Sequence, residues 1–310
     1  MKKRVINILG IIISLALLYF LFRGVDWHEL WAAFKNARYS IVIIAILVNL
    51  FGFYFRTLRF CEIIRHIAPN ASVKRVFPSI AAGYAANNLL PLRAGEFVRA
   101  YHAGKQLNHD KAALFSCVVV ERIVDVATLA VILCVTMLFY KMEAWIGKVA
   151  VFLIIGLIFG IFILYMIVRH WDKCERFVPK VARKFARSLA DGFRAIKSAG
   201  QMLKVVGISM IIWTVEATTI FFVAMSFGLN YSILGSVFVM LLINLIIIIP
   251  AAPGNFGTLE TAAKAGFMAF AVPDGQATAV TLLLHGVQFL PITAVGLVFL
   301  IGSGVKLNDC

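Results

Sequence analysis

Charged residues are scarce in this 310-residue chain. They make up 15% of it, while hydrophobic residues reach 62%; an ordinary soluble domain carries about 25% charged residues. The scarcity argues against a soluble globular fold, because several apolar runs approach the 20 or so residues that a transmembrane helix needs. The sequence therefore predicts an all-α polytopic membrane protein, with residues 1–310 forming a single integral membrane domain.

Acidic residues are scarcer than basic ones, with 15 Asp and Glu against 30 Lys and Arg. The net charge of +15 would suit nucleic acid in a soluble protein. Here the basic residues lie between apolar runs, which favours anionic lipid headgroups and argues against nucleic acid. We expect membrane lipids, anionic or phosphate-bearing, as partners. A homo-oligomer and a lipid-modifying enzyme partner stay open.

Cysteine is too sparse and scattered for a disulfide framework or a zinc site. The five cysteines are odd in number and contain no Cys-x-x-Cys pair, so we expect apolar packing from Cys61, Cys117, Cys134, Cys174 and Cys310. The motifs GxSxG, HExxH, Walker A and GxGxxG are also absent from the sequence. The sequence therefore predicts no metal, no other cofactor and no catalytic residue.

Long apolar runs predict six spanning helices. They cover 5–22, 41–55, 112–140, 149–168, 205–225 and 277–302. The first is interpreted as an uncleaved membrane helix, because it is long for a signal peptide and no A-x-A site follows it. Two further segments, 77–111 and 233–272, are apolar but interrupted by Pro and Gly, and they are predicted to be re-entrant helical hairpins.

The positions of Lys and Arg predict the orientation. Of the 30, 22 fall in the segments 1–4, 56–76, 97–111, 169–204 and 303–310, and only five fall in 23–40 and 141–148. The positive-inside rule then places both termini in the cytoplasm, in a cell (inner or plasma) membrane. This arrangement requires both hairpins to return to the face they entered, because a full crossing by either would put a basic loop outside.

The two interrupted segments share a pattern, Pro-x-x-x-Gly-[Glu/Asn]-Phe. It begins at Pro91 and again at Pro250, and the flanking elements follow one order in the halves 1–140 and 149–302. With opposite orientations, the halves are predicted to be inverted pseudo-repeats. Paired interrupted segments of this kind indicate a transporter-type site near the midplane. Chance is the alternative, since the pattern fixes only three letters.

Two amphipathic segments lie between the runs. In 173–199, apolar residues recur every three or four positions and basic residues fill the other face, which predicts a helix on the cytoplasmic surface. In 23–40, a shorter stripe of Trp27, Leu30, Trp31 and Phe34 is expected at the outer interface, where Trp is favoured. For 173–199, a lipid-facing role is preferred to a partner-binding one.

The first interruption carries the candidate substrate-binding residues Arg93, Glu96 and Arg99. Pro91 ends one half-helix and Gly95 permits the turn, so the next half-helix begins near Glu96 with unpaired N–H groups that favour an anion. The forked donors of two arginines match a phosphate. Glu96 then pairs with an arginine or with a cationic part of the substrate. An ordinary cytoplasmic loop with solvated charges is the alternative.

Three charged residues interrupt the run 112–140: Glu121, Arg122 and Asp125. Glu121 and Asp125 share a helix face, and Arg122 neighbours Asp125. Each charge at a helix centre costs about 2.5–3.5 kcal/mol to insert. The three are therefore expected to face the protein interior and meet partners, either as a structural ion-pair cluster or as a gate on a polar path. Glu216, alone in 205–225, joins them as a gating or ion-pair residue.

The second interruption contains the helix breakers Pro250, Pro253, Gly254 and Gly257. Asn255 lies within it and Glu260 follows in the next half-helix, and these two are predicted to contact substrate or, for Glu260, a coupling proton. His285 and Gln288 are further polar groups in 277–302. Packing is the preferred interpretation of His285 over proton transfer.

These motifs resemble a known family. Pro91–Glu96 with Arg99 is similar to its P-x-R-x-G-E segment, Glu121 to Asp125 to its E-R-x-x-D, and Pro250–Glu260 to its P-x-x-P-G-x-x-G-x-x-E. The family is that of the lysylphosphatidylglycerol synthase transmembrane (flippase-like) region, which includes the membrane half of the multiple peptide resistance factor. Asn255 departs from the Gly that is common there.

The resemblance implies movement of aminoacyl-phosphatidylglycerol or another phosphate-bearing lipid between leaflets, with a role in antimicrobial peptide resistance. Full-length members add a soluble C-terminal domain that transfers lysine, and this sequence is expected to lack it. A membrane-embedded transferase acting on lipid headgroups, of the phosphatidylglycerol lysyltransferase type, is one alternative. A non-transporting partner of a lipid-modifying enzyme is the other.

Overall fold

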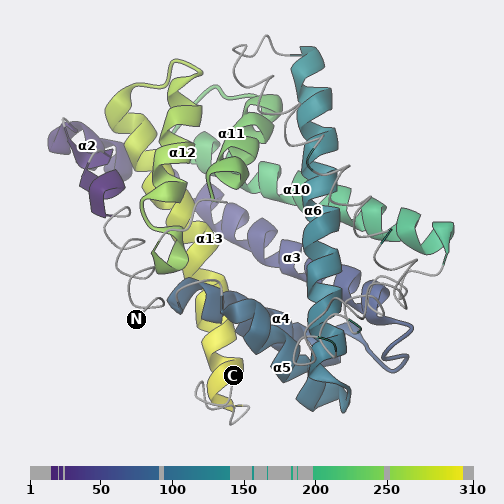
Figure 1. Cartoon of the computed structure of the whole chain (residues 1–310). Helices are drawn as coiled ribbons and strands as arrows, with labels where there is room; N and C mark the ends of the chain where they lie inside the picture. Colours follow the sequence, from purple (N-terminus) through teal and green to yellow (C-terminus); the bar gives the residue numbers. More distant parts are fainter. Residues whose placement is uncertain are drawn as a thin grey trace. The chain divides into compact units, whose positions relative to one another are not determined.

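The structure, a computed structural model, consists of helices joined by turns and short connections in the part that is described (Figure 1). It describes residues 15–19, 21–23, 25–90, 94–139, 156, 166, 183, 187, 198–247 and 252–302. No strand occurs among these residues. The predicted all-α class is therefore confirmed for this part of the chain.

The helices follow the apolar runs in order. They are α2 (Trp27–Asn36), α3 (Tyr39–Ile64), α4 (Val73–Leu89), α5 (Gly95–Leu107), α6 (Lys111–Phe139), α10 (Ala199–Ser226), α11 (Ile233–Ile246), the 3-10 turn η3 (Pro253–Asn255), α12 (Thr258–Met268) and α13 (Asp274–Gly302). Within each predicted hairpin, a break separates two shorter helices: α4 from α5, and α11 from α12.

Three of the described helices are long and apolar enough to cross a membrane: α3, α10 and α13. They correspond to the predicted spans 41–55, 205–225 and 277–302. Helix α6 matches 112–140 and has 29 residues, with its charged residues in mid-helix. The predicted span 149–168 and the predicted surface helix 173–199 lie almost wholly outside the described residues, as does most of 5–22.

The predicted end of the second span at residue 55 is wrong for the helix itself. Helix α3 continues to Ile64, so Arg59 and Glu62 belong to it and not to a loop. The helix continues because Phe60, Ile63 and Ile64 keep its apolar face; all three side chains are fully buried. Arg59 is buried with them, which requires partners for its charge.

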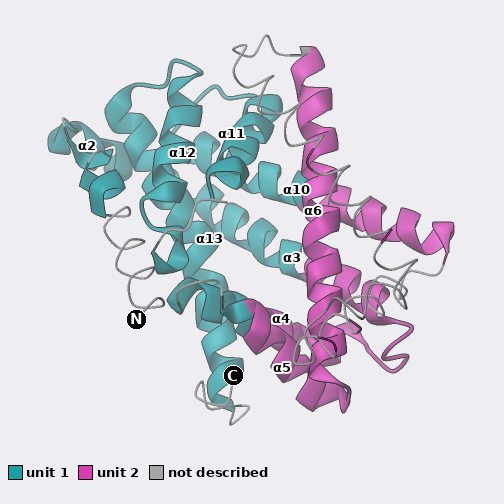
Figure 2. Cartoon of the chain, in the orientation of Figure 1, with its two compact units in different colours: residues 1–53, 81–95, 213–304 teal, residues 54–80, 96–212, 305–310 magenta. Residues whose placement is uncertain are grey.

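The chain forms two compact units (Figure 2). Unit 1 contains residues 1–53, 81–95 and 213–304, and unit 2 contains 54–80, 96–212 and 305–310. The boundaries fall inside α3, α4 and α10, so each unit combines segments from both predicted halves. The inverted-repeat organisation stays a prediction.

Unit 1 is built around α11, α12 and α13. Helix α11 packs against α12, α12 against α13, and α13 against α2. The amphipathic α2 begins at Asp26, whose side chain accepts hydrogen bonds from the backbone N–H groups of His28 and Glu29. Leu30 of α2 is buried while Trp27 and Trp31 are exposed, as expected for a helix lying on a surface.

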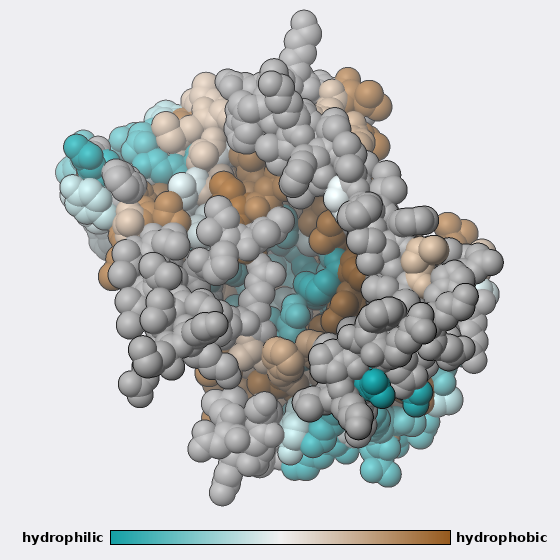
Figure 3. All heavy atoms as spheres, viewed as in Figure 1, coloured by the Kyte–Doolittle hydropathy of each residue, from teal (hydrophilic) through white to brown (hydrophobic). Residues whose placement is uncertain are grey.

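Unit 2 joins the first part of α4 to α5 and α6. Ser79 Oγ lies 2.8 Å from His102 Nδ1, and the rings of Phe97 and Phe115 stack with centroids 4.5 Å apart. The upper part of α6 exposes hydrophobic side chains, among them Leu138, whereas hydrophilic atoms gather at the connection from α5 to α6 (Figure 3). Such a distribution suits a helix with one end in lipid and the other in water.

Candidate functional site

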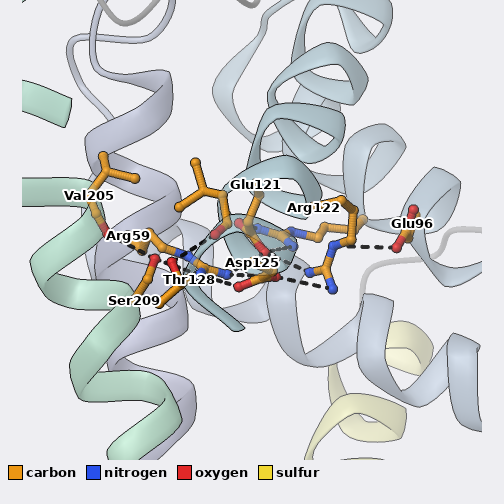
Figure 4. A network of polar contacts seen from close by, with 10 residues as sticks. Arg59, Glu96, Glu121, Arg122, Asp125, Thr128, Val205 and Ser209 are labelled. Carbon is orange, nitrogen blue, oxygen red and sulfur yellow. Dashed lines mark hydrogen bonds and ion pairs between the residues drawn. The ribbon is translucent and has the colours of Figure 1, made fainter. Parts of the chain in front are cut away.

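A network of charged side chains lies in unit 2 (Figure 4). Helix α6 contributes Glu121, Arg122 and Asp125, which fall in its middle. Helix α3 contributes Arg59, and α5 contributes Glu96 and Arg99. The network therefore assembles charges that are far apart in sequence, on helices whose other residues are mainly apolar.

Arg59 is the most enclosed member, and its guanidinium group is fully buried. One terminal nitrogen donates to Asp125 Oδ1 at 2.5 Å and the other to Oδ2 at 3.2 Å. The first nitrogen also donates to Ser209 Oγ of α10 at 2.9 Å, and the second lies 3.2 Å from Glu121 Oε1. Three helices of unit 2 thus converge on one cation, a geometry that favours a fixed ion pair.

Arg99 forms a second two-pronged pair. Its terminal nitrogens donate to the two carboxylate oxygens of Glu121 at 2.9 Å and 2.7 Å, and its guanidinium lies 4.0 Å from the ring centroid of Phe60. Arg99 is buried, as is Glu121. One N–H of each terminal amino group is therefore engaged by Glu121, whereas Nε of Arg99 has no hydrogen-bond partner among the described residues.

Arg122 occupies the accessible edge of the network, with 35% of its side chain exposed. It bonds to Glu121 Oε1 at 2.9 Å and lies 3.4 Å from Asp125 Oδ2. Its Nε lies 3.6 Å from Glu96 Oε1, and the side chain of Glu96 is 23% exposed. The contact between Arg122 and Glu96 is the longest in the network and joins its two most exposed side chains. It is therefore the contact that a ligand replaces most easily.

The charges of the network balance: the guanidinium groups of Arg59, Arg99 and Arg122 face the carboxylates of Glu96, Glu121 and Asp125. Buried charges are tolerated when they are paired and hydrogen-bonded. An anionic ligand that enters would upset the balance unless it releases a carboxylate or brings a cation. Glu96 is the carboxylate in position to leave.

The second interrupted segment forms a separate polar cluster in unit 1. Gly254, Asn255 and Gly257 have positive φ angles of 72°, 59° and 87°, which glycine and asparagine adopt most readily. Glu260 Oε2 accepts the backbone N–H of Gly257 at 2.8 Å, and Oε1 lies 2.6 Å from His285 Nδ1 of α13. The carboxylate therefore connects the start of α12 to α13.

The structure locates most of the predicted site residues. Glu96 and Arg99 lie with Glu121, Arg122 and Asp125 in unit 2, whereas Asn255 and Glu260 lie in unit 1. Gly95 begins α5 so close to α4 that a β-carbon there would meet the carbonyl oxygen of Gly83. Pro253 begins η3, and Glu216 is partly buried in α10. Arg93, Pro91 and Pro250 lie outside the described residues.

Sequence reasoning missed two participants and one pairing. Arg59 was counted among loop charges, although the apolar spacing of Phe60, Ile63 and Ile64 indicates that the helix continues around it. Ser209 gave no signal, because one serine in an apolar run is unremarkable until its partner is known. For His285, a predicted buried polar group, the sequence does not identify Glu260 as the partner.

Comparison with known proteins covers nearly the whole chain. The family model described as the lysylphosphatidylglycerol synthase TM region matches residues 7–296. A UPF0104 membrane protein of Methanothermobacter thermautotrophicus is 24% identical over 99% of this chain and 98% of its own length. Another, of Methanocaldococcus jannaschii, is 23% identical over 95% of this chain and 93% of its own length.

A further relative is longer than this chain. The glycosyltransferase AglD of Haloferax volcanii is 23% identical over 99% of this chain but only 55% of its own length. Nearly half of AglD therefore has no counterpart in the alignment. No solved structure matches.

Proposed function

The chain belongs to the family of the lysylphosphatidylglycerol synthase TM region, and from that premise we propose that it moves a phosphate-bearing lipid between the leaflets of the cell membrane. It would act as a flippase or scramblase, with an aminoacyl-phosphatidylglycerol-like phospholipid as the first candidate substrate. Such a protein needs a polar passage for a headgroup within an apolar, membrane-embedded fold.

The observation that carries the proposal is the charge network on α3, α5 and α6, with its one accessible edge. A purely structural ion-pair cluster would need only the buried pairs of Arg59 and Arg99. Arg122 and Glu96 add a contact of 3.6 Å between side chains that are 35% and 23% exposed. A lipid phosphate can replace Glu96 at Arg122, since guanidinium binds phosphate in two-pronged fashion, and the buried pairs then stay intact.

The remaining predicted site residues have roles in this scheme. Arg93, four residues before Phe97 at the helix break, supplies a second guanidinium group for the phosphate. Glu96, once released, contacts a headgroup amine. Arg99 holds Glu121 in place through two hydrogen bonds. Asn255 and Glu260 act at the second break, on headgroup or proton.

The proposed topology has six spanning helices and two re-entrant hairpins in inverted halves, with both termini cytoplasmic. Its support is the helix–break–helix form of both interrupted segments. In the second, α11 packs against α12 and the η3 turn lies between them in sequence. Short helices broken at matched positions are typical of secondary transporters.

A transferase role is the second candidate, and AglD is the observation that favours it. That relative is named a glycosyltransferase, and it matches this chain over 55% of its own length. The chain would then serve as the membrane part of a lipid-headgroup transferase, of glycosyl or lysyl type, or as its partner. Either role requires a catalytic domain beyond the residues matched here.

The test is lipid flipping in proteoliposomes. Lipids with a fluorescent headgroup are bleached from outside by dithionite, for several headgroups, and bleaching beyond half of the signal shows translocation. We expect wild type to pass this limit and Arg122→Ala and Arg93→Ala to fall towards it. Arg65→Ala is the matched control, because Arg65 pairs with Glu62 with 60% of its side chain exposed.

A plateau at half for every headgroup, with and without an imposed proton gradient, overturns the proposal. Lipid mass spectrometry of expressing cells then tests the alternative. A new lipid species that depends on this chain indicates a transferase role, whereas an unchanged lipid profile leaves a partner role.

A further inference from the structure

Polar side chains line one face of α13 in unit 1. Thr281, His285 and Gln288 are spaced four and three residues apart, which places them on the same side of a helix. Thr281 and His285 are buried, and no hydrogen-bond partner is found for Thr281 Oγ1, His285 Nε2 or Gln288 Nε2. Buried polar atoms are ordinarily satisfied, so three on one face point to a functional role.

His285, the middle residue of this face, contacts Glu260. Nδ1 and Oε1 are 2.6 Å apart, and the side chains of His285 and Glu260 are only 6% and 2% exposed. The rings of Phe256 and Phe289 flank the imidazole at centroid distances of 4.5 Å and 5.6 Å. Two titratable groups therefore share one hydrogen bond in an apolar surrounding.

The proton count decides the charge of this pair. With one proton beyond the neutral imidazole, Glu260 and His285 together are neutral; without it, they carry one buried negative charge. Burial of an uncompensated charge is costly. The N-terminus of α12 and the Gly257 N–H offset part of that cost.

The elements that pack against α12 and α13 carry further charged and titratable groups, among them Asp26, His28, Glu29 and Lys35 of α2. Lys264 of α12 bonds to Asp274 at 2.8 Å and to the carbonyl of Leu21. Glu29 of α2 packs against Gly275 of α13. Helix α11 has no titratable side chain. Helix α4 approaches α13 at Gly296 with its residues 81–89, and Tyr84 is the titratable side chain among them.

We propose that Glu260 and His285 form a proton-binding site, and that its proton is exchanged during lipid translocation. His285 Nε2 is the atom through which the proton passes, because Nδ1 is held by Glu260. Gln288 and Thr281 extend the polar face over seven residues of helix, about 10 Å. The exchange rests on the proposed function; the binding of the proton does not.

The proton also acts on the helix break. Glu260 Oε2 accepts the N–H of Gly257, and a carboxylate accepts a hydrogen bond more strongly than a protonated carboxyl. Proton release therefore strengthens the hydrogen bond from Gly257 N–H to Glu260, and proton uptake weakens it. The three residues with positive φ, Gly254, Asn255 and Gly257, are the part of the chain that this hold fixes.

The first experiment measures proton binding without transport. Infrared difference spectra are recorded between acid and alkaline pH on the full chain in lipid nanodiscs. We expect carboxyl and imidazole bands that are lost in Glu260→Gln and altered in His285→Gln, while Glu29→Gln leaves them unchanged. Gln at position 260 keeps an oxygen for Gly257, so folding is retained; a monodisperse elution profile checks this. Superimposable spectra of wild type and Glu260→Gln overturn the proton site.

The second experiment measures coupling in proteoliposomes of phosphatidylglycerol and phosphatidylethanolamine, with fluorescent lipid and an imposed pH gradient. We expect the gradient to raise the wild-type flipping rate, and the ratio of rates with and without gradient to fall to one in Glu260→Gln. Wild-type flipping that ignores the gradient overturns the coupling and leaves translocation standing. Absence of flipping together with intact infrared bands overturns the proposed function and leaves the proton site.

Discussion

Replacing Arg59 with Met is the most direct test of the charge network. Met matches the unbranched stem of arginine and removes its charge. The guanidinium is fully buried and holds Asp125 through two hydrogen bonds, with Glu121 and Ser209 as further neighbours. Its loss leaves three carboxylates facing two guanidinium groups in an apolar surrounding.

The expected loss of unfolding free energy is about 3–5 kcal/mol, the cost of removing one partner from a buried ion pair. Asp125 loses most of its stabilisation, because the guanidinium that still pairs with it is that of Arg122 at 3.4 Å. Glu121 loses less, because Arg99 still binds both of its oxygens.

The assay is unfolding in mixed micelles with increasing sodium dodecyl sulfate, followed by circular dichroism or tryptophan fluorescence. Arg65→Met is the matched control: Arg65 lies just beyond the end of α3 and pairs with Glu62 at 2.7 Å, but it is largely exposed. Exposed pairs contribute about 0–1 kcal/mol. Equal losses for the two variants would refute the view that the network is buried and tightly paired.

The double variant Arg59→Met with Asp125→Asn removes one charge of each sign. Since neutrality returns, we expect it to be more stable than the sum of the single losses predicts, by about 0.5–3 kcal/mol. Strict additivity would show that Arg59 and Asp125 do not interact.

Other predictions follow from packing and exposure. Gly95→Ala is expected to lower the midpoint of thermal unfolding, because the added β-carbon meets backbone atoms of α4. Gly207→Ala on α10 is expected to raise or preserve the midpoint, because its β-carbon meets nothing within 4 Å. Size-exclusion profiles after heating measure both midpoints, and equal shifts would contradict the close approach at Gly95. Cys134 is exposed on α6 and Cys117 is buried, so in single-cysteine variants a lipid-soluble maleimide labels Cys134 and not Cys117. Reporter fusions at both ends are expected to report the cytoplasm, and a reporter outside the membrane at either end contradicts the predicted topology.

The sequence predicted the helices whose apolar runs have polar ends. Helices α6 and α13 begin and end within three residues of their predicted limits, whereas α10 begins six residues before the predicted start at 205. It also predicted that the segments around Pro91 and Pro253 are broken, since those residues cannot continue a helix there.

The pairing of charges could not be predicted in the same way. The Asp125 and Ser209 partners of Arg59 are 66 and 150 residues away in sequence, so local sequence assigns Arg59 to a loop and predicts that α3 ends before it. Likewise Glu260 and His285 lie 25 residues apart. Local spacing shows that a buried charge needs a partner, but tertiary packing decides which residue provides it.

The order of the network along the chain has a consequence for biogenesis. Arg59 and Arg99 are synthesised before Glu121 and Asp125, so their cations are already at the membrane when α6 leaves the ribosome. Arg59 lies near the end of α3. From there a long basic side chain can reach the membrane–water interface until α6 is inserted. Helix α6 then inserts beside Arg59 and Arg99, whose cations pair with its carboxylates. The same helix synthesised alone, without residues 1–110, would face the full insertion cost of its three charges, about 2.5–3.5 kcal/mol each.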